Sequence, residues 1–244
     1  MIRMIPNKDN TSKYFAFMHN IALFQGIKKE DLNEFFAKMQ IEQYHKGEIQ
    51  QFDPKQHSKL YIVFKGTFKL TNTNVEGDEI VLSLFSAGDA VTPLYFSPYF
   101  DVSAGFIEDT ILFHFKENDV QRFVKNNHQF SMNNIKFLAN SVQNLMITNT
   151  VLQLKTAKER VGWFLAHGKI NNNSELPVSK NIIASFLGIT PESFSRALSS
   201  LKNDGVTINN KIIQLDNGDE LCKYCDRVTG SNCSLFRTEP CAHY

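Results

Sequence analysis

The chain has 244 residues, enough for two domains of ordinary size, and a formal net charge of +1 at pH 7. No apolar run approaches the ~20 residues of a membrane helix, and the first ten residues lack the apolar core of a signal peptide. These features argue against a membrane-spanning or secreted protein, and we expect a soluble protein of the cytoplasm.

The first half of the chain predicts a short helix followed by a β-roll. Apolar residues recur at helical spacing in residues 27–40. Short strands punctuated by glycine turns follow at residues 43–48, 60–64, 67–71, 79–85 and 110–115. Even spacing of short strands is typical of a β-roll or jelly roll, which either holds a ligand or only packs on itself.

A long helix is predicted over residues 132–154, between further helices at 116–127 and 156–167. Positions spaced by three and four form a seam along it: Ile135, Leu138, Val142, Leu145, Asn149 and Leu152. Such a seam packs either within the chain or against a second copy in a parallel coiled coil. In the second case Asn149 would favour two strands in register.

Residues 179–201 predict a helix-turn-helix. Ser179 can cap a first helix, and Gly188 can end it in the left-handed conformation. Thr190 can cap a second helix that has Pro191 in its first position. One face of this second helix is apolar (Phe194, Ala197, Leu198 and Leu201) and the other is polar (Glu192, Ser193, Ser195, Arg196 and Ser199).

The polar face suits a DNA major groove, because arginine can bind both acceptors of a guanine and a carboxylate can accept from a cytosine amine. Residues 206–208 and 211–215 predict a hairpin closed by Asn209 and Asn210, which can supply positive φ. Helix, turn, helix and hairpin make a winged helix; the alternatives are an ordinary amphipathic helix pair or a generic small α+β module. A winged helix commonly binds a two-fold operator, so we favour the homodimer for the long helix.

The four cysteines all lie in the last 23 residues, at Cys222, Cys225, Cys233 and Cys241. Four thiolates suit tetrahedral zinc or an iron–sulfur cluster. The second tight Cys-x-x-Cys of a zinc ribbon is missing, so we favour a 4Fe–4S cluster over structural zinc. Disulfides, the third interpretation, are disfavoured in a reducing cytoplasm. Apart from His243, which could replace a ligand, the histidines are scattered without ligand spacing: His19, His45, His57, His114, His128 and His167.

The order of these elements resembles that of the CRP/FNR transcription regulators. Four stretches carry the resemblance: Gly47–Ile49 with Tyr61–Leu70, Ser86–Asp89, Ala157–Val161, and Leu187–Arg196. The resemblance covers roughly residues 20–216 and implies an α+β fold. Its parts would be a cyclic-nucleotide-binding-like β-roll (1–130), a dimerisation helix (131–154), a winged helix-turn-helix (155–218) and a cysteine-rich tail (219–244).

Glu192, Ser195 and Arg196 match the Glu-x-x-Ser-Arg pattern of the FNR type. This resemblance implies an operator similar to TTGAT–N4–ATCAA, with Arg196 on guanine, Glu192 on the cytosine side and Ser195 on a base edge. Some FNR relatives also place a cluster-binding cysteine set after the DNA-binding domain.

The family's cyclic-nucleotide binders carry Gly-Glu and Arg-Ser where this chain has Thr92-Pro93 and Val102-Ser103. Without the arginine the phosphate loses its bidentate partner, so we expect no tight binding of cAMP or cGMP. The aromatic stretch 94–100 could hold an apolar effector or be plain core.

We therefore predict a DNA-binding transcription regulator, with double-stranded DNA, a second copy and RNA polymerase as partners. We expect it to respond to oxygen, nitric oxide or redox state through the iron–sulfur tail. The alternative is the same class of regulator with structural zinc and a small-molecule effector in the roll. A cupin-like enzyme is disfavoured, because the roll shows neither a His-x-His or His/Glu metal set nor a catalytic Ser/His/Asp arrangement.

Overall fold

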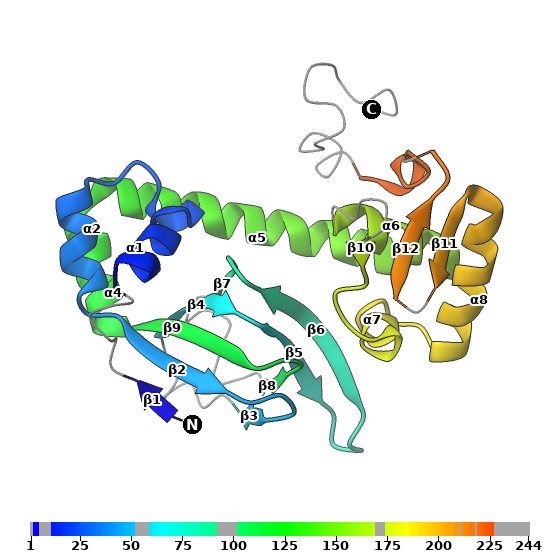
Figure 1. Cartoon of the computed structure of the whole chain (residues 1–244), viewed down its shortest axis with the longest axis horizontal. Helices are drawn as coiled ribbons and strands as arrows, with labels where there is room; N and C mark the ends of the chain where they lie inside the picture. The colour runs from blue at the N-terminus through cyan, green and yellow to red at the C-terminus, as the bar shows by residue number, and fades with distance from the viewer. Residues whose placement is uncertain are drawn as a thin grey trace. The chain divides into compact units, whose positions relative to one another are not determined.

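The computed structural model describes residues 2–4, 11–51, 59–91, 102–168, 174–209, 211–217 and 219–226. The chain divides into two compact units, residues 1–142 and 143–244 (Figure 1), and each is described by itself. Within the described residues, no helix is long and apolar enough to cross a membrane.

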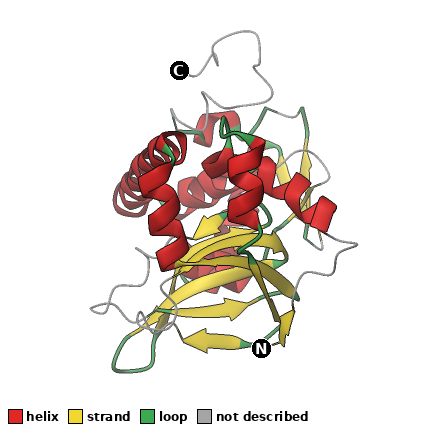
Figure 2. Ribbon diagram, turned by 90° about the vertical axis from the view of Figure 1, so that its left-hand side faces the viewer, coloured by secondary structure: helices red, strands yellow, loops and turns green. Residues whose placement is uncertain are grey.

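The first unit contains the predicted β-roll. Its strands are β1 (Ile2–Met4), β2 (Gln40–Tyr44), β3 (Ile49–Gln51), β4 (Lys59–Lys65), β5 (Thr67–Thr73), β6 (Glu79–Ser86), β7 (Ala90–Val91), β8 (Ser103–Phe106) and β9 (Thr110–Lys116). They form two antiparallel sheets, one in the order β1-β2-β9-β4-β7 and one in the order β3-β8-β5-β6. Figure 2 shows these strands gathered together.

Helices of the first unit cover one face of the five-stranded sheet. They are α1 (Thr11–His19), the 3-10 helix η2 (Ala22–Phe24), α2 (Lys29–Phe36), α4 (Glu117–Asn126) and the first part of α5 (His128–Leu154). Aromatic rings fill the space between helices and sheet: Phe35 stacks on both Phe115 and Phe123 with ring centroids 4.3 Å apart. Each fully buried Phe contributes on the order of 1.5–3 kcal/mol, so this cluster holds the helices on the sheet.

Both faces of strand β4 are buried, so its sequence lacks the alternation of apolar and polar residues that is expected of a half-exposed strand. Leu60 and Ile62 belong to the cluster beneath the helices, whereas Tyr61 and Val63 belong to the cluster inside the roll. All four are at most 1% exposed. The strand therefore separates the two apolar cores of the unit.

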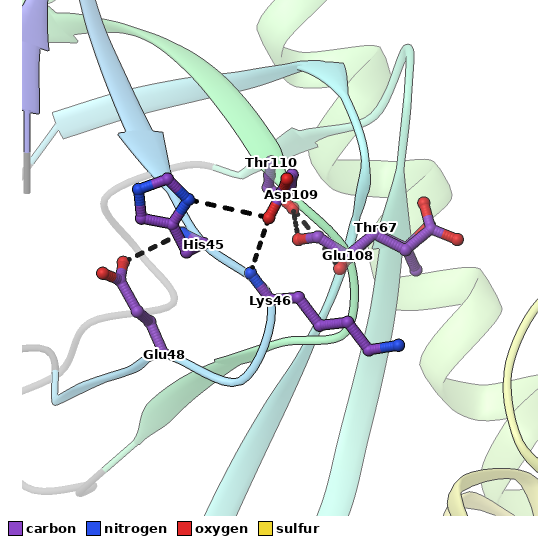
Figure 3. A network of polar contacts seen from close by, with 7 residues as sticks. All are labelled: His45, Lys46, Glu48, Thr67, Glu108, Asp109 and Thr110. Atoms are coloured by element: carbon purple, nitrogen blue, oxygen red, sulfur yellow. Dashed lines mark hydrogen bonds and ion pairs between the residues drawn. The ribbon is translucent and has the colours of Figure 1, made fainter.

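A polar network joins three turns at one end of the roll (Figure 3). The amide of Lys46 donates to the Asp109 carboxylate at 2.9 Å, and the Thr110 hydroxyl donates to the carbonyl oxygens of Glu108 and Thr67. Gly66 has a φ of +89°, and a Cβ there would lie 2.6 Å from the carbonyl oxygen of Asp109. Only glycine fits this close approach, so the turn between β4 and β5 is locked against β9.

The second unit is a winged helix-turn-helix, as predicted. Its elements are α6 (Ala157–His167), β10 (Ser174–Glu175), α7 (Lys180–Phe186), α8 (Pro191–Leu201), the 3-10 helix η4 (Lys202–Asp204), β11 (Val206–Asn209), β12 (Ile212–Leu215) and the 3-10 helix η5 (Cys222–Tyr224). Strands β10, β12 and β11 form the antiparallel sheet of the wing, in that order. A capping box of Thr156 and Glu159 begins α6.

Some predicted boundaries are wrong. The helix expected over residues 27–40 ends at Phe36, and the strand expected from residue 43 begins at Gln40, because residues 40–44 pair with β9. The long helix begins at His128 rather than residue 132. The predictions omit α1 and five short strands, β1, β3, β7, β8 and β10. Strands of two to four residues exist only through pairing with distant strands, so they leave little local signal.

The wing turn also differs from the expectation. Asn210 lies outside the described residues, and Asn209 is the last residue of β11. Among the described non-glycine residues, the positive φ falls on Lys211, at 83°.

Candidate DNA-binding site and cysteine tail

Local hydrogen bonds define where the recognition helix α8 begins. Gly188 has a φ of +61° and ends the preceding helix in the left-handed conformation. Thr190 caps α8, since its hydroxyl accepts from the Ser193 amide at 3.2 Å, and Pro191 occupies the first turn. These predictions from sequence are confirmed. Ser179 is the N-cap residue of α7, but the predicted capping by its side chain is wrong, because that side chain makes no capping hydrogen bond.

Recognition helix α8 has one buried face and one exposed face. Phe194, Ala197 and Leu201 are buried, at 0%, 5% and 0% exposure. Glu192, Ser195, Arg196 and Ser199 are exposed, and Ser193 is half-buried. Burial of the apolar face anchors the helix and leaves the polar face available to a ligand.

The exposed face carries an anion and a cation one helical turn apart. The pKa of Glu192 is lowered by its own backbone amide, by the Thr190 hydroxyl and by the charge of Arg196. Glu192 is therefore a carboxylate at neutral pH, able only to accept hydrogen bonds, whereas Arg196 only donates. The hydroxyls of Ser195 and Ser199 donate to backbone carbonyls one turn earlier, at 3.0 and 3.1 Å, and keep lone pairs to accept.

Arg160 is a positioning residue that sequence reasoning did not single out. Its Nε donates to the Lys155 carbonyl at 2.9 Å and its Nη1 donates to the Leu187 carbonyl at 3.1 Å. Leu187 precedes Gly188 in the turn between α7 and α8. Arg160 therefore ties the start of α6 to the turn of the helix-turn-helix.

The predicted seam of α5 is largely uncovered in the single chain. Ile135, Val142 and Leu145 are 59%, 56% and 59% exposed, and Met146 beside them is 67% exposed. Asn149 is exposed, and its side-chain oxygen accepts from Gln153 at 2.9 Å. Leu138 and Leu152 are half-buried. An apolar stripe of this length in water is unfavourable unless another surface covers it.

Two of the four predicted cysteine ligands fall in the described residues. Cys222 is 5% exposed and Cys225 is half-buried, and neither is in a disulfide. The Cys225 amide donates to the Cys222 carbonyl at 3.1 Å, so one tight turn carries both thiols. Cys233 and Cys241 lie outside the described residues. Within the described part, no group of three or more His, Cys, Asp and Glu side chains is arranged to hold a metal ion.

The segment that carries these thiols contacts the helix-turn-helix. Tyr224 donates to the Asp204 carboxylate, and Trp163 Nε1 donates to Asp226 at 2.7 Å. Lys158, Lys223 and Tyr224 together hold the pKa of Asp204 well below its usual range. No local pattern in the sequence indicates these contacts, because they join residues far apart along the chain.

A second missed feature is a buried charge cluster inside the β-roll. Glu42 and His114 are both 0% exposed, with His114 Nε2 3.0 Å from Glu42 Oε1. Lys59 Nζ donates to the same oxygen at 3.1 Å, and the Tyr44 hydroxyl donates to Oε2 at 2.9 Å. Glu42 therefore has three partners, whereas the buried Nδ1 of His114 has no hydrogen-bond partner among the described residues.

The structure thus defines a winged helix-turn-helix protein with a β-roll, and comparison with known proteins finds the same helix-turn-helix domain and the same fold elsewhere. The family model of the Crp-like helix-turn-helix domain matches residues 152–224. FixK2 from Bradyrhizobium japonicum is similar in fold, with a TM-score of 0.66 at 24% identity over 76% of this chain and 96% of that chain. A CooA mutant from Carboxydothermus hydrogenoformans gives 0.64 at 22% identity, over 80% and 94%. No curated protein sequence matches the chain.

Residues 152–224 therefore match the Crp-like helix-turn-helix domain, and the chain shares its fold with FixK2 and CooA. The helix-turn-helix match and the shared fold confirm the resemblance inferred from the sequence.

Proposed function

We propose that the protein binds, as a homodimer, a two-fold DNA operator similar to TTGAT–N4–ATCAA. The observation that carries this proposal is the exposed face of α8, where Glu192, Ser195 and Arg196 stand above a fully buried apolar face. An anchored helix with a polar N-terminal front fits the major groove. Residues 155–218 would bind DNA, residues 131–154 would dimerise, and residues 1–130 and 219–244 would sense signals. RNA polymerase would be a further partner.

Each exposed residue of α8 has a distinct role in this proposal. Arg196 donates to both acceptors of a guanine, and Glu192 accepts from the amine of a cytosine. Ser195 contacts a base edge. Ser193 and Ser199 lie beside them and bind phosphate or base edges through their hydroxyls.

Replacing Arg196 with alanine is expected to weaken operator binding by about 1–3 kcal/mol and to relax specificity at one base pair in each half-site. The measurement is fluorescence anisotropy with the operator and with variants substituted at each position. Lys180→Ala is the matched control, since it also removes an exposed positive charge of the helix-turn-helix, outside α8. If the affinity for all DNA sequences falls equally, Arg196 contacts a phosphate, which would contradict its assignment to guanine.

We further propose that Cys222, Cys225, Cys233 and Cys241 hold a 4Fe–4S cluster. The close pair of thiols on one turn supports this proposal, as does the clustering of the four cysteines in the sequence. When bound, such a cluster reacts with oxygen or nitric oxide and changes charge with redox state. The tail would then change the DNA affinity of the winged helix.

Anaerobic purification followed by a visible spectrum and assays of iron, sulfide and zinc tests the tail. We expect a broad absorption that bleaches in air, and we expect Cys222→Ser to lose it while the helix content of the protein is unchanged. One zinc per chain without colour would make the tail a structural clasp. Absence of any metal would leave a thiol switch and refute the cluster.

The β-roll provides little support for a cyclic-nucleotide effector. Val102, which stands where the family's nucleotide binders have arginine, is 3% exposed within the apolar cluster of the roll. Thr92, Pro93 and the aromatic stretch 94–100 lie outside the described residues. We propose that the protein does not bind cAMP tightly; a thermal shift with cAMP tests this.

A further inference from the structure

Tyr224, which lies between Cys222 and Cys225 in sequence, packs tightly on helix α6. Its side chain is 6% exposed. At Gly162 of α6, an added Cβ would lie 2.4 Å from Tyr224 Cγ, a distance that real Cβ atoms do not reach. Glycine at 162 is therefore what allows the ring to lie directly against the helix backbone.

The hydroxyl of Tyr224 reaches the end of the recognition helix. It donates to the carboxylate of Asp204, the last residue of η4, which continues directly from α8. Lys158 of α6 pairs with the same carboxylate at 2.5 Å, and Lys223 pairs with it at 2.8 Å. Asp204 is thus the point where α6, the end of α8 and the cysteine segment meet.

A separate contact attaches the segment to α6 alone. Trp163 Nε1 donates to Asp226 at 2.7 Å, and this bond does not involve Asp204. The two attachments differ in what they hold: Asp226 fixes the segment to α6, whereas Tyr224 also connects it to α8.

Two backbone hydrogen bonds close the turn that carries the two thiols and Tyr224. The amide of Tyr224 donates to the Leu221 carbonyl at 3.0 Å, and the amide of Cys225 donates to the Cys222 carbonyl at 3.1 Å. Tyr224 lies inside this hydrogen-bonded turn, so its ring and the two thiols are attached to one short backbone segment. On the side of α6 the ring is in close contact with the backbone at Gly162, so a shift of the segment would change this contact.

We propose that Tyr224 and Asp204 are positioning residues that carry the state of the cysteine pair to the recognition helix. The inference rests on the proposed sensing role of the cysteines. The structure also gives it a part that does not depend on a bound metal: the Tyr224–Asp204 contact holds the C-terminal end of α8. Loss of this contact frees η4 and changes the presentation of α8 to DNA.

The first test is hydrogen exchange of the full-length protein at the Gly205 amide, which donates to the Lys202 carbonyl at 3.0 Å in η4. Tyr224→Phe keeps the ring on Gly162 and removes only the hydroxyl, and Asp204→Asn removes the charge. Both are expected to speed Gly205 exchange by at least about tenfold, the loss of a hydrogen bond to a charged group. Gly162→Ala should reach the same result by displacing the ring.

Asp226→Asn is the matched control, because it weakens the attachment to α6 and leaves Asp204 in place. Its Gly205 exchange is expected to equal that of the wild type. Unchanged exchange in Tyr224→Phe would overturn the positioning role. Equal acceleration in Asp226→Asn would also overturn it, since any loosening of the tail would then suffice.

The second test compares operator affinity in anaerobically purified protein and in protein stripped of iron and zinc by a chelator. The wild-type ratio of the two affinities is expected to differ from one. In Tyr224→Phe this ratio of affinities should approach one, with the iron or zinc content unchanged. If Tyr224→Phe instead keeps the wild-type ratio, the signal does not pass through Tyr224. A wild-type ratio of one refutes the sensing function itself, and Gly205 exchange then decides the positioning role alone.

Discussion

Replacing Glu42 with glutamine is expected to lower the free energy of unfolding of the first unit by about 3–5 kcal/mol. The substitution removes the anion from a site that is 0% exposed and leaves Lys59 and His114 facing a neutral amide. Breaking a buried ion pair from one side is costly because the remaining charge stays out of water without compensation. Denaturant unfolding monitored by circular dichroism measures the change.

The effect of Glu42 should depend on pH in a defined direction. Burial alone would raise the pKa of Glu42, but His114, Lys59 and Tyr44 outweigh it and lower the pKa from 4.5 to about 2. A lowered pKa in the folded state means that ionisation of Glu42 stabilises the fold fully above pH 4.5. This contribution is lost as the pH falls from 4.5 towards 2. The difference in the free energy of unfolding between the wild type and Glu42→Gln should therefore become smaller over that pH range.

Glu76→Gln is the control for this prediction, since Glu76 is exposed in the turn between β5 and β6. It should change stability by less than ~0.5 kcal/mol at every pH. If Glu42→Gln were as stable as Glu76→Gln at neutral pH, the buried network would not contribute to the stability of the roll.

Replacing Leu145 with glutamate is expected to convert the proposed dimer to monomer and to weaken operator binding by about 10²–10⁴-fold. Leu145 is 59% exposed in the single chain, at a seam position of α5. In a parallel coiled coil the two copies would place two carboxylates opposite each other in an apolar seam. Each monomer would then bind its half-site alone, without the gain from linking two sites.

Sedimentation and operator anisotropy on the same samples measure both effects. Asn140→Glu adds the same charge to α5 at an exposed position away from the seam, and should remain dimeric with wild-type affinity. A dimeric Leu145→Glu protein with unchanged DNA binding would rule out the seam as the interface. Monomeric wild-type protein would contradict the homodimer itself.

The sequence alone was sufficient to predict the recognition helix in detail. Gly188, Thr190 and Pro191 act on residues within one helical turn, so their roles depend on neighbours that are adjacent in the chain. The spacing of Phe194, Ala197 and Leu201 by three and four residues likewise predicts the buried face, because side chains at this spacing lie on one side of a helix. The seam of α5 is predicted by the same periodicity. The periodicity does not say which surface covers the seam.

Only the tertiary structure decided the contacts that join distant segments. Glu42 and His114 meet because β2 and β9 pair in one register, and a shift by one residue would turn one side chain to the opposite face. Tyr224 meets Asp204 because Gly162 lets its ring approach α6. Such contacts depend on strand register and on the fit of packed surfaces, which are properties of the whole fold and leave no periodic signal in the sequence.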